Sequence, residues 1–170
     1  MSLDKKQHSY AKEMLELYKA GNHKQLIDLS RKLQHKLTQN SVAHDIIAAS
    51  NLALGNIEEA IYHYSKSLGI ATNNPETCLN LGMIYTELGQ YESALDYFSK
   101  AIQLESDYLE AHFGIANIFH LQKSYRKAVQ KYRAVLDLKP DYEEALNNLG
   151  ATFLEYGKPK EAIPVLTKLV

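Results

Sequence analysis

The sequence predicts an all-α protein, a solenoid in which antiparallel pairs of helices stack one after another. Three observations support this prediction. Apolar residues recur three or four positions apart along most of the chain, which places them on one face of an α-helix. Small and aromatic residues repeat every 34 positions, and glycine repeats at the break between two helical segments. A fixed period of this length with a helix–turn–helix unit is the signature of a stacked repeat protein.

The elements follow from this period. Helices are expected at 4–20 and 23–37, separated by Gly21, and at 41–54 and 57–71. A first helix at 75–88 ends in the turn around Gly89, and further first helices are expected at 109–122 and 143–156, each followed by a second helix. The turn glycines, in register at 34 residues, are Gly21, Gly55, Gly89 and Gly157, with Lys123 as the exception.

Small residues also keep the period. They predict close approach between the two helices of each pair. The positions in the first helices are Ala48, Gly82, Ala116 and Gly150, and those in the second helices are Ala60, Ala94, Ala128 and Ala162.

Helix starts carry their own patterns. Asn74 can cap the helix that Pro75 opens. Asp107 with Glu110, and Asp141 with Glu144, place an acceptor at the cap and a carboxylate three residues later, so capped starts are expected there as well.

Residues 75–108 resemble the tetratricopeptide repeat (TPR) family, whose unit spaces an aromatic residue, Leu-Gly/Ala, Tyr, a turn, Ala, an aromatic residue, Ala and Pro. The matching residues are Leu81, Gly82, Tyr85, Ala94, Phe98 and Ala101, while Cys78 and Ser106 depart from the pattern. The resemblance is strong over 41–170 and weaker before Ser41. It implies an alpha-alpha superhelix whose first helices line a concave surface on which ligands bind.

In this frame, 1–170 is a single solenoid domain with repeats at 7–40, 41–74, 75–108, 109–142 and 143–170. The first repeat diverges from the pattern and is expected to cap the N-terminal end. The last repeat is short, carries Pro159 and Pro164, and ends on apolar residues. We expect either a fragment of a longer protein or a second chain that covers this end.

Composition narrows the classes of function. A formal net charge of −1 gives no overall attraction to nucleic acid or to an anionic membrane. No apolar run approaches the length of about 18 residues that a membrane span needs, and no signal sequence is evident, so a cytoplasmic protein is expected. The single cysteine, Cys78, cannot form an internal disulfide and is expected to be a small buried residue.

No catalytic set is apparent. The sequence has no phosphate-binding glycine loop, no His-Glu-x-x-His and no paired cysteines, so we expect no enzyme activity, no cofactor and no metal. His44 and His112 lie two repeats apart and are expected in the core, while His112 and His120 are too far apart on one helix to share a metal ion.

Charge is distributed unevenly between the two kinds of helix. The first helices at 41–54, 75–88, 109–122 and 143–156 contain no Lys or Arg, whereas the second helices carry both. One TPR binding mode grips the carboxylate ends of chaperone tails with cations from the first helices, and it is therefore excluded. The expected partner is a protein or peptide, neutral to basic with apolar anchors; nucleic acid binding and membrane insertion are not expected.

Asparagines suggest the other family mode, in which an extended peptide is held through its backbone. Asn80 and Asn148 share a repeat position, which partly resembles the asparagine ladder of protein O-linked N-acetylglucosamine transferases. Alternatively, these amides satisfy polar groups between helices. The candidate peptide-binding residues on the concave face are Asp45, Asn80, Met83, Glu87, Phe113, Asn117, His120, Asn147, Asn148, Ala151 and Glu155.

The function that these patterns favour is a non-catalytic protein–protein interaction scaffold. Two alternatives remain open. The chain could be the substrate-recognition arm of a larger glycosyltransferase- or sulfotransferase-like enzyme whose catalytic domain lies beyond residue 170. It could also be a self-assembling module that forms a homo-oligomer through its C-terminal end.

Overall fold

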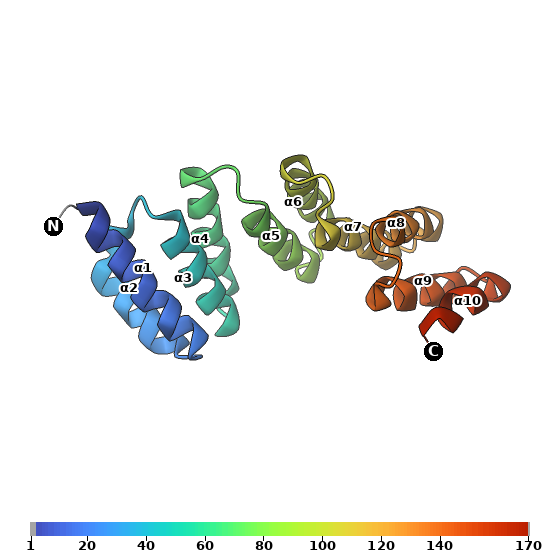
Figure 1. Ribbon diagram of the computed structural model, residues 1–170, viewed down its shortest axis with the longest axis horizontal. Coiled ribbons are helices and arrows are strands. Elements are labelled where there is room, and N and C mark those ends of the chain that lie inside the picture. Colours follow the sequence, from blue (N-terminus) through green and yellow to red (C-terminus); the bar gives the residue numbers. More distant parts are fainter. Residues whose placement is uncertain (1–2, 170) are drawn as a thin grey trace. The chain divides into compact units, whose positions relative to one another are not determined.

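The computed structural model describes residues 3–169, with side chains from Tyr10 onward. Within that range the chain forms ten α-helices in tandem pairs and no β-strand, which confirms the all-α solenoid (Figure 1). The helices are α1 (Leu3–Lys19), α2 (His23–Leu37), α3 (Ser41–Ala53), α4 (Ile57–Ile70), α5 (Pro75–Glu87), α6 (Tyr91–Leu104), α7 (Leu109–Leu121), α8 (Tyr125–Leu138), α9 (Glu143–Glu155) and α10 (Pro159–Leu166), followed by a 3-10 turn at Thr167–Leu169.

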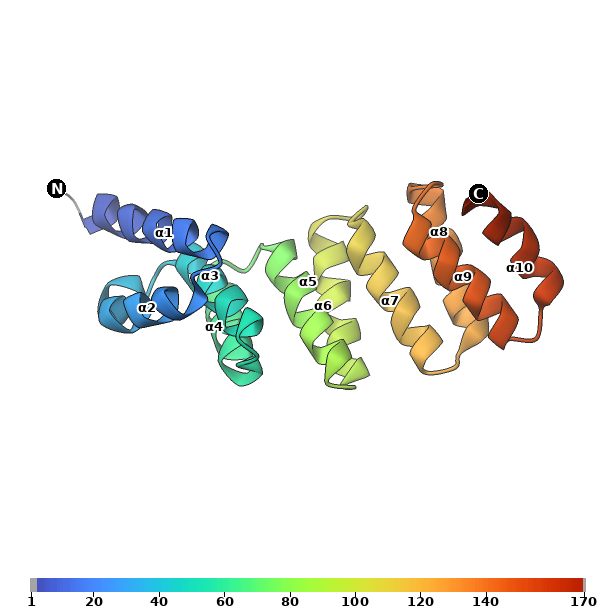
Figure 2. The same cartoon turned by 90° about the horizontal axis from the view of Figure 1, so that it is seen from below.

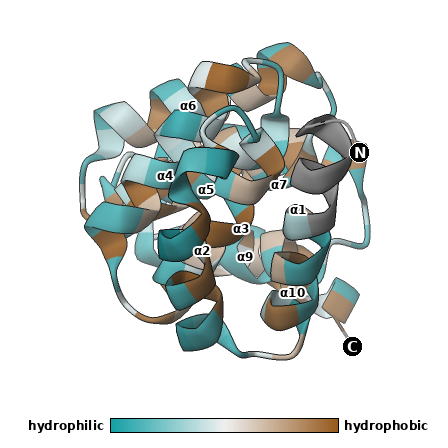
Figure 3. Cartoon of the chain, turned by 90° about the vertical axis from the view of Figure 1, so that its left-hand side faces the viewer, coloured by the Kyte–Doolittle hydropathy of each residue, from teal (hydrophilic) through white to brown (hydrophobic). Residues whose placement is uncertain are grey.

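The helices gather into two compact units, the first ending at Leu81 and the second beginning at Gly82. In the first unit α3 contacts α1, α2 and α4. A helix with neighbours on several sides is apolar around most of its surface, and Figure 3 shows α3 mostly brown while α2 alternates between brown and teal. The core of this unit comprises Met14, Leu26, Ile27, Leu33, Leu37, Ala43, Ile46 and Ile47.

In the second unit each helix from α6 to α10 packs against the next, and α7 also contacts α9 (Figure 2). First helices of consecutive repeats are therefore neighbours, as a stacked solenoid requires. The core of this unit comprises Ala116, Ala128, Tyr132, Val135, Ala145, Leu149, Phe153 and Ala162.

The small residues fulfil the role expected of them. A Cβ on Gly82 would lie 2.6 Å from the Phe98 ring, and a Cβ on Gly150 would collide with Leu166, which occupies the position of Phe98 two repeats later. Gly114 makes the same kind of contact, since its Cβ would lie 2.5 Å from the other side of that ring. The 34-residue pattern of small residues did not predict this role for Gly114.

The turns between paired helices share one backbone conformation. Gly21, Gly55, Gly89 and Gly157 all have φ between 71° and 78°. Lys123 takes the same place in its turn with φ of 55°, although it has a side chain. The 34-residue period thus fixes a left-handed residue at every one of these turns, whichever amino acid stands there.

Helix capping agrees with the sequence only in part. Asn74 caps α5, because its Oδ1 accepts a hydrogen bond from the Thr77 N–H at 3.2 Å. Asn40, one period earlier, caps α3 in the same way through the Ala43 N–H at 2.9 Å, which was not predicted.

The prediction that Asp107 and Asp141 cap their helices is wrong. The caps are Tyr108 and Tyr142, whose side chains make no capping hydrogen bond. The Tyr142 ring instead packs edge-on against Phe113 at 5.2 Å between ring centroids. An aromatic contact of this kind is comparable in energy to a cap worth about 1 kcal/mol, and it holds Tyr142 at the start of α9.

Two further predictions concern burial. Cys78 is buried, with 2% of its surface exposed, as expected. His44 and His112, expected in the core, are only half-buried. His112 bonds the Ser106 carbonyl through Nε2 at 2.9 Å, and His44 pairs with His63. Each imidazole therefore reaches a polar partner at the edge of the helix packing, which a core position would not provide.

Candidate functional site

The candidate peptide-binding residues all lie on first helices, as the sequence placed them, and they divide between the two units. Asp45 on α3 and Asn80 on α5 belong to the first unit. The others belong to the second unit: Met83 and Glu87 on α5, Phe113, Asn117 and His120 on α7, and Asn147, Asn148, Ala151 and Glu155 on α9.

The first unit contains a groove of about 640 Å³ lined by α1, α3, α4 and α5, and both Asp45 and Asn80 line it. Its apolar wall includes Val42, which is 57% exposed, and Tyr18. The lining residues include the carboxylates of Asp45 and Glu76 but no Lys, Arg or His. The groove is therefore open, partly apolar and acidic.

Asp45 links α3 to the start of α5. Its Oδ1 accepts a hydrogen bond from the Thr77 hydroxyl at 2.8 Å, and its Oδ2 accepts one from the Asn74 amide at 3.2 Å. Burial raises the pKa of Asp45, although the nearby hydroxyls of Ser67 and Thr77 oppose the rise. The Ser67 hydroxyl lowers the pKa of Asp45 because it lies close to the carboxylate, although this buried hydroxyl makes no hydrogen bond of ordinary geometry.

This geometry gives Asp45 a structural role in addition to any contact with a ligand. Each carboxylate oxygen already accepts one hydrogen bond and retains a lone pair that can accept another. Asp45 therefore keeps hydrogen-bonding capacity beyond the link between α3 and α5.

In the second unit Asn117 and Asn148 are joined across α7 and α9. Asn117 Oδ1 accepts hydrogen bonds from Asn148 Nδ2 at 2.9 Å and from the Tyr132 hydroxyl at 2.6 Å. Burial raises the pKa of Tyr132 to about 12, so its hydroxyl stays protonated and donates. Asn148 thus makes the inter-helix contact that was the alternative explanation for these asparagines, and a peptide would compete for its amide.

His120 belongs to an adjoining chain of hydrogen bonds. The Thr152 hydroxyl donates to the Asn148 carbonyl at 2.6 Å, so its only proton is in use. It must therefore accept a hydrogen bond from His120 Nδ1, 2.9 Å away, which places the ring proton on Nδ1. His120 Nε2 is left 3.7 Å from Glu155 Oε1, where protonation of the ring would create an ion pair.

Most of the remaining candidates in the second unit have exposed side chains, and Phe113 is the exception. Met83 is 51% exposed, and Glu87, Asn147 and Ala151 are also exposed. Phe113 is half-buried, because its ring contacts Tyr132 and Tyr142. The structure therefore brings Asn117, His120, Asn148 and Glu155 together, and Phe113 is shared with the core.

Sequence reasoning missed several residues that share these surfaces. Tyr18, Val42 and Glu76 line the groove of the first unit. Thr152 links His120 to Asn148, and Leu121 is half exposed at the end of α7. Glu76 and Val42 stand on first helices, so helical periodicity could have found them, whereas the link through Thr152 depends on how α7 and α9 pack.

Neither a metal site nor a membrane span emerges from the described residues. Among the described side chains, from Tyr10 to Leu169, no three His, Cys, Asp or Glu residues are grouped as metal ligands would be. Between residues 3 and 169 no helix combines the length and the apolar character needed to cross a membrane.

Comparison with known proteins agrees with the repeat pattern. The family model described as "Tetratricopeptide repeat" matches residues 75–108, and the one described as "TPR repeat" matches residues 116–157. No curated protein matches the sequence.

Solved structures with a similar fold include TPR proteins. The crystal structure of MamA protein superposes with a TM-score of 0.85 at 19% identity, over 95% of this chain and 88% of that one. YrrB, described as a TPR protein with an unusual peptide-binding site, gives 0.78 at 19% identity, over 99% and 90%. The MamA RS-1 ArsTM double mutant gives 0.87 at 14% identity, over 98% and 94%. At these identities the likeness is one of fold.

Proposed function

Because this chain is a tetratricopeptide repeat protein, we propose that it is a non-catalytic cytoplasmic scaffold that binds a segment of a partner protein along its first helices. The TPR fold supports a role in protein–protein interaction in general. The observation that carries the finer proposal is the groove of about 640 Å³ in the first unit, lined mainly by first helices.

The lining of this groove favours a neutral to basic segment with apolar anchors. Val42 and Tyr18 offer apolar surface at its wall, where a leucine-sized side chain can exclude water. Asp45 and Glu76 provide negative charge, and no cation among the lining residues offsets it. A lysine or arginine next to an apolar anchor would find complementary contacts here.

Asn80 adds a means of holding the backbone of the segment. It is half-buried in the lining of the groove, and its amide can donate to a carbonyl and accept from an N–H of an extended chain. YrrB, similar in fold, is described as having a peptide-binding site, which makes a peptide a reasonable ligand class for this chain.

The experiment uses a short fluorescent peptide that alternates leucine and lysine, titrated into the full chain. Glu76→Lys places a cation in the groove and is expected to weaken binding about five- to tenfold. Glu92→Lys is the matched control, because Glu92 is also an exposed glutamate in the first turn of a helix but lies on α6. Equal affinity for the parent chain and Glu76→Lys would refute the acidic groove.

The two alternatives from the sequence stay predictions. A recognition arm for a larger enzyme and a self-assembling module both use the same repeat architecture. No set of described residues favours either alternative over the scaffold.

A further inference from the structure

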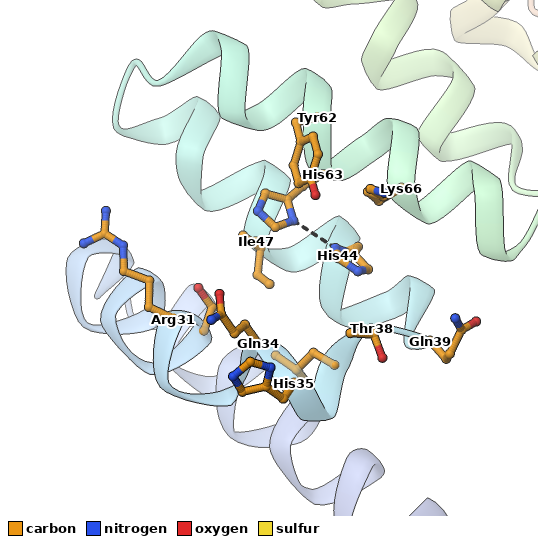
Figure 4. A pocket seen from close by; sticks show the side chains of 12 residues that line it. Arg31, Gln34, His35, Thr38, Gln39, His44, Ile47, Tyr62, His63 and Lys66 are labelled. Carbon is orange, nitrogen blue, oxygen red and sulfur yellow. Dashed lines mark hydrogen bonds between the residues drawn. The ribbon is translucent and has the colours of Figure 1, made fainter.

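A second surface, of opposite charge, lies on another side of α3. It is a pocket of about 530 Å³ lined from α2, α3 and α4 of the first unit, with Arg31, His35, His44, His63 and Lys66 among its lining residues (Figure 4). Where α3 turns Asp45 toward the acidic groove, it turns His44 and Ile47 toward this pocket.

No carboxylate lines the pocket. Two permanent cations and three imidazoles do, together with hydroxyls and amides. Two acids act on lining residues from outside the pocket: Asp28 pairs with Arg31 at 3.5 Å, where both side chains are well exposed, and Glu59 acts on His63 from one turn earlier on α4. The lining itself thus carries two cationic side chains and no carboxylate, which favours an anion over a cation as its ligand.

The histidines at the centre are neutral and close together. His44 Nδ1 and His63 Nδ1 are 2.8 Å apart, so one must carry a proton and donate while the other accepts (Figure 4). Burial lowers the pKa of His63 to about 4, with a further contribution from His44 and an opposing one from Glu59. Burial also lowers the pKa of His44, and the charge of Lys66 adds to the effect.

The pocket does not stand alone. A second hollow of about 500 Å³ shares Thr38, Gln39, Tyr62 and Lys66 with it and continues along α4 to Gly69 and Ile70. We call the two adjoining hollows together the trough, and their volumes of about 530 and 500 Å³ exceed what a single small anion fills. Gln34 and Gln39 offer amides that can bond a peptide backbone, and Ile47 offers apolar surface.

We propose that this trough is a second protein-binding site, which takes an acidic segment of a partner with its carboxylates against Arg31, His63 and Lys66. It is separate from the acidic groove and does not depend on it. Because a bound carboxylate favours the protonated imidazole, binding takes up a proton at the histidine pair. The affinity is therefore expected to rise as the pH falls toward the range in which free histidine titrates.

The test uses hexaglutamate as the probe and the full chain, followed by ¹H–¹⁵N chemical shifts at pH 7.5 and pH 5.5, where glutamate is still ionised. We expect shifts at Gln34, Gln39, His63 and Lys66, tighter binding at pH 5.5 by about three- to tenfold, and an upward shift of the His63 titration when the peptide is bound. Glu76→Lys should leave this binding unchanged, which separates the trough from the groove.

Lys66→Glu is expected to weaken hexaglutamate binding about tenfold. Lys100→Glu is the matched control, because Lys100 stands one 34-residue period later, is exposed, and lies over Tyr97 as Lys66 lies over Tyr62. Both lysines are on the surface, and far-ultraviolet circular dichroism checks that each variant is folded.

Three results would overturn the proposal: shifts confined to residues outside the trough, equal affinity for Lys66→Glu and the parent chain, or affinity that does not rise at pH 5.5. Inorganic phosphate is titrated in parallel. Tighter binding of phosphate than of hexaglutamate at the same residues would mean a small anion site, and a protein segment would then be the wrong ligand.

Discussion

Lys123 has a backbone conformation that suits glycine better than lysine. Its φ is 55°, while the equivalent positions in the other turns are glycines with φ between 71° and 78°. A residue with a Cβ is strained in this left-handed region by roughly 1–2 kcal/mol. The strain is tolerated because the turn closes through backbone hydrogen bonds, among them Lys123 N–H to the His120 carbonyl at 2.8 Å.

Lys123→Gly is therefore expected to stabilise the protein. The free energy of unfolding, measured by urea denaturation, should rise by about 1 kcal/mol. Gln130→Gly, at an exposed position inside α8, is the control and should cost about 1 kcal/mol. A loss of stability in Lys123→Gly would show that the lysine side chain stabilises the turn by more than its backbone strain costs.

Phe98 illustrates how one side chain organises two repeats. Its ring is 1% exposed and lies between Gly82 and Gly114, so that neither glycine has room for a methyl group. Because the ring is held from both sides, it cannot move away from an added Cβ without disturbing the packing of α6 against α7.

Gly114→Ala should therefore destabilise the protein by about 1–3 kcal/mol despite the better helix propensity of alanine. Gly69→Ala is the matched control, since Gly69 is also helical and nothing lies within 4 Å of its added Cβ. That change should stabilise by about 0.5–1 kcal/mol. Thermal unfolding of both variants checks the pair, and equal effects at the two glycines would contradict the Phe98 packing.

At the scale of helices, α3 and α4 are joined by a histidine pair whose protonation opposes folding. The pKa of His63 is lowered from 6.5 to about 4 in the folded chain. Between these two values the unfolded chain binds a proton that the folded chain does not, so the free energy of unfolding falls as the pH falls from 6.5 to 4. The stability is fully present above that window.

The expected loss across this window is about 1–2 kcal/mol once the water-facing part of the imidazole is considered. His63→Gln should flatten the dependence of unfolding free energy on pH, as measured by urea denaturation at several pH values. His35→Gln removes an exposed histidine from the same pocket and is the matched control. If the unfolding free energy of His63→Gln still depends on pH as in the parent chain, His63 is not the source of that dependence.

The first helices α3, α5, α7 and α9 contain acidic residues but no lysine or arginine, whereas α4, α6 and α8 carry charges of both signs. Glu87 on α5 and Glu155 on α9 are exposed and carry no lysine or arginine partner on their own helices. Their reversal tests the acidic character of the second unit independently of the groove in the first.

Glu87→Lys with Glu155→Lys is expected to weaken binding of the leucine–lysine peptide severalfold and to change stability by less than about 0.5 kcal/mol. Asp96→Lys with Glu105→Lys is the control, because it makes the same change of charge at exposed positions on and just after α6. Fluorescence anisotropy gives the affinities. Binding that is unchanged by the double reversal on first helices would refute an acidic surface in this unit.

For the whole molecule, the repeat period predicted the architecture closely. Every helix with a range expected from the sequence, namely 4–20, 23–37, 41–54, 57–71, 75–88, 109–122 and 143–156, begins and ends within a residue of it. The period predicts the architecture because the backbone requires glycine at the turns and small residues where helices meet. Both kinds of residue can be read directly from the sequence. The caps at Tyr108 and Tyr142, in place of Asp107 and Asp141, show its limit, since neither tyrosine side chain makes a capping hydrogen bond.

The candidate sites were less predictable, because they depend on which helices meet. His44 and His63 are 19 residues apart on different helices, and Asn117 and Asn148 are 31 apart. Neither pair is spaced by the period, so the sequence could place each residue on a helix but could not pair them. The net charge did not predict either site, because a value of −1 is compatible with both an acidic groove and a basic trough within the first unit.

The central claim is that a partner segment binds along the first helices. The most direct test is ¹H–¹⁵N chemical-shift mapping of the full chain with the leucine–lysine peptide. We expect the largest shifts at Val42, Asp45 and Asn80, with little change along α2 and α4. Shifts concentrated on α2 and α4, with Val42, Asp45 and Asn80 unmoved, would contradict it.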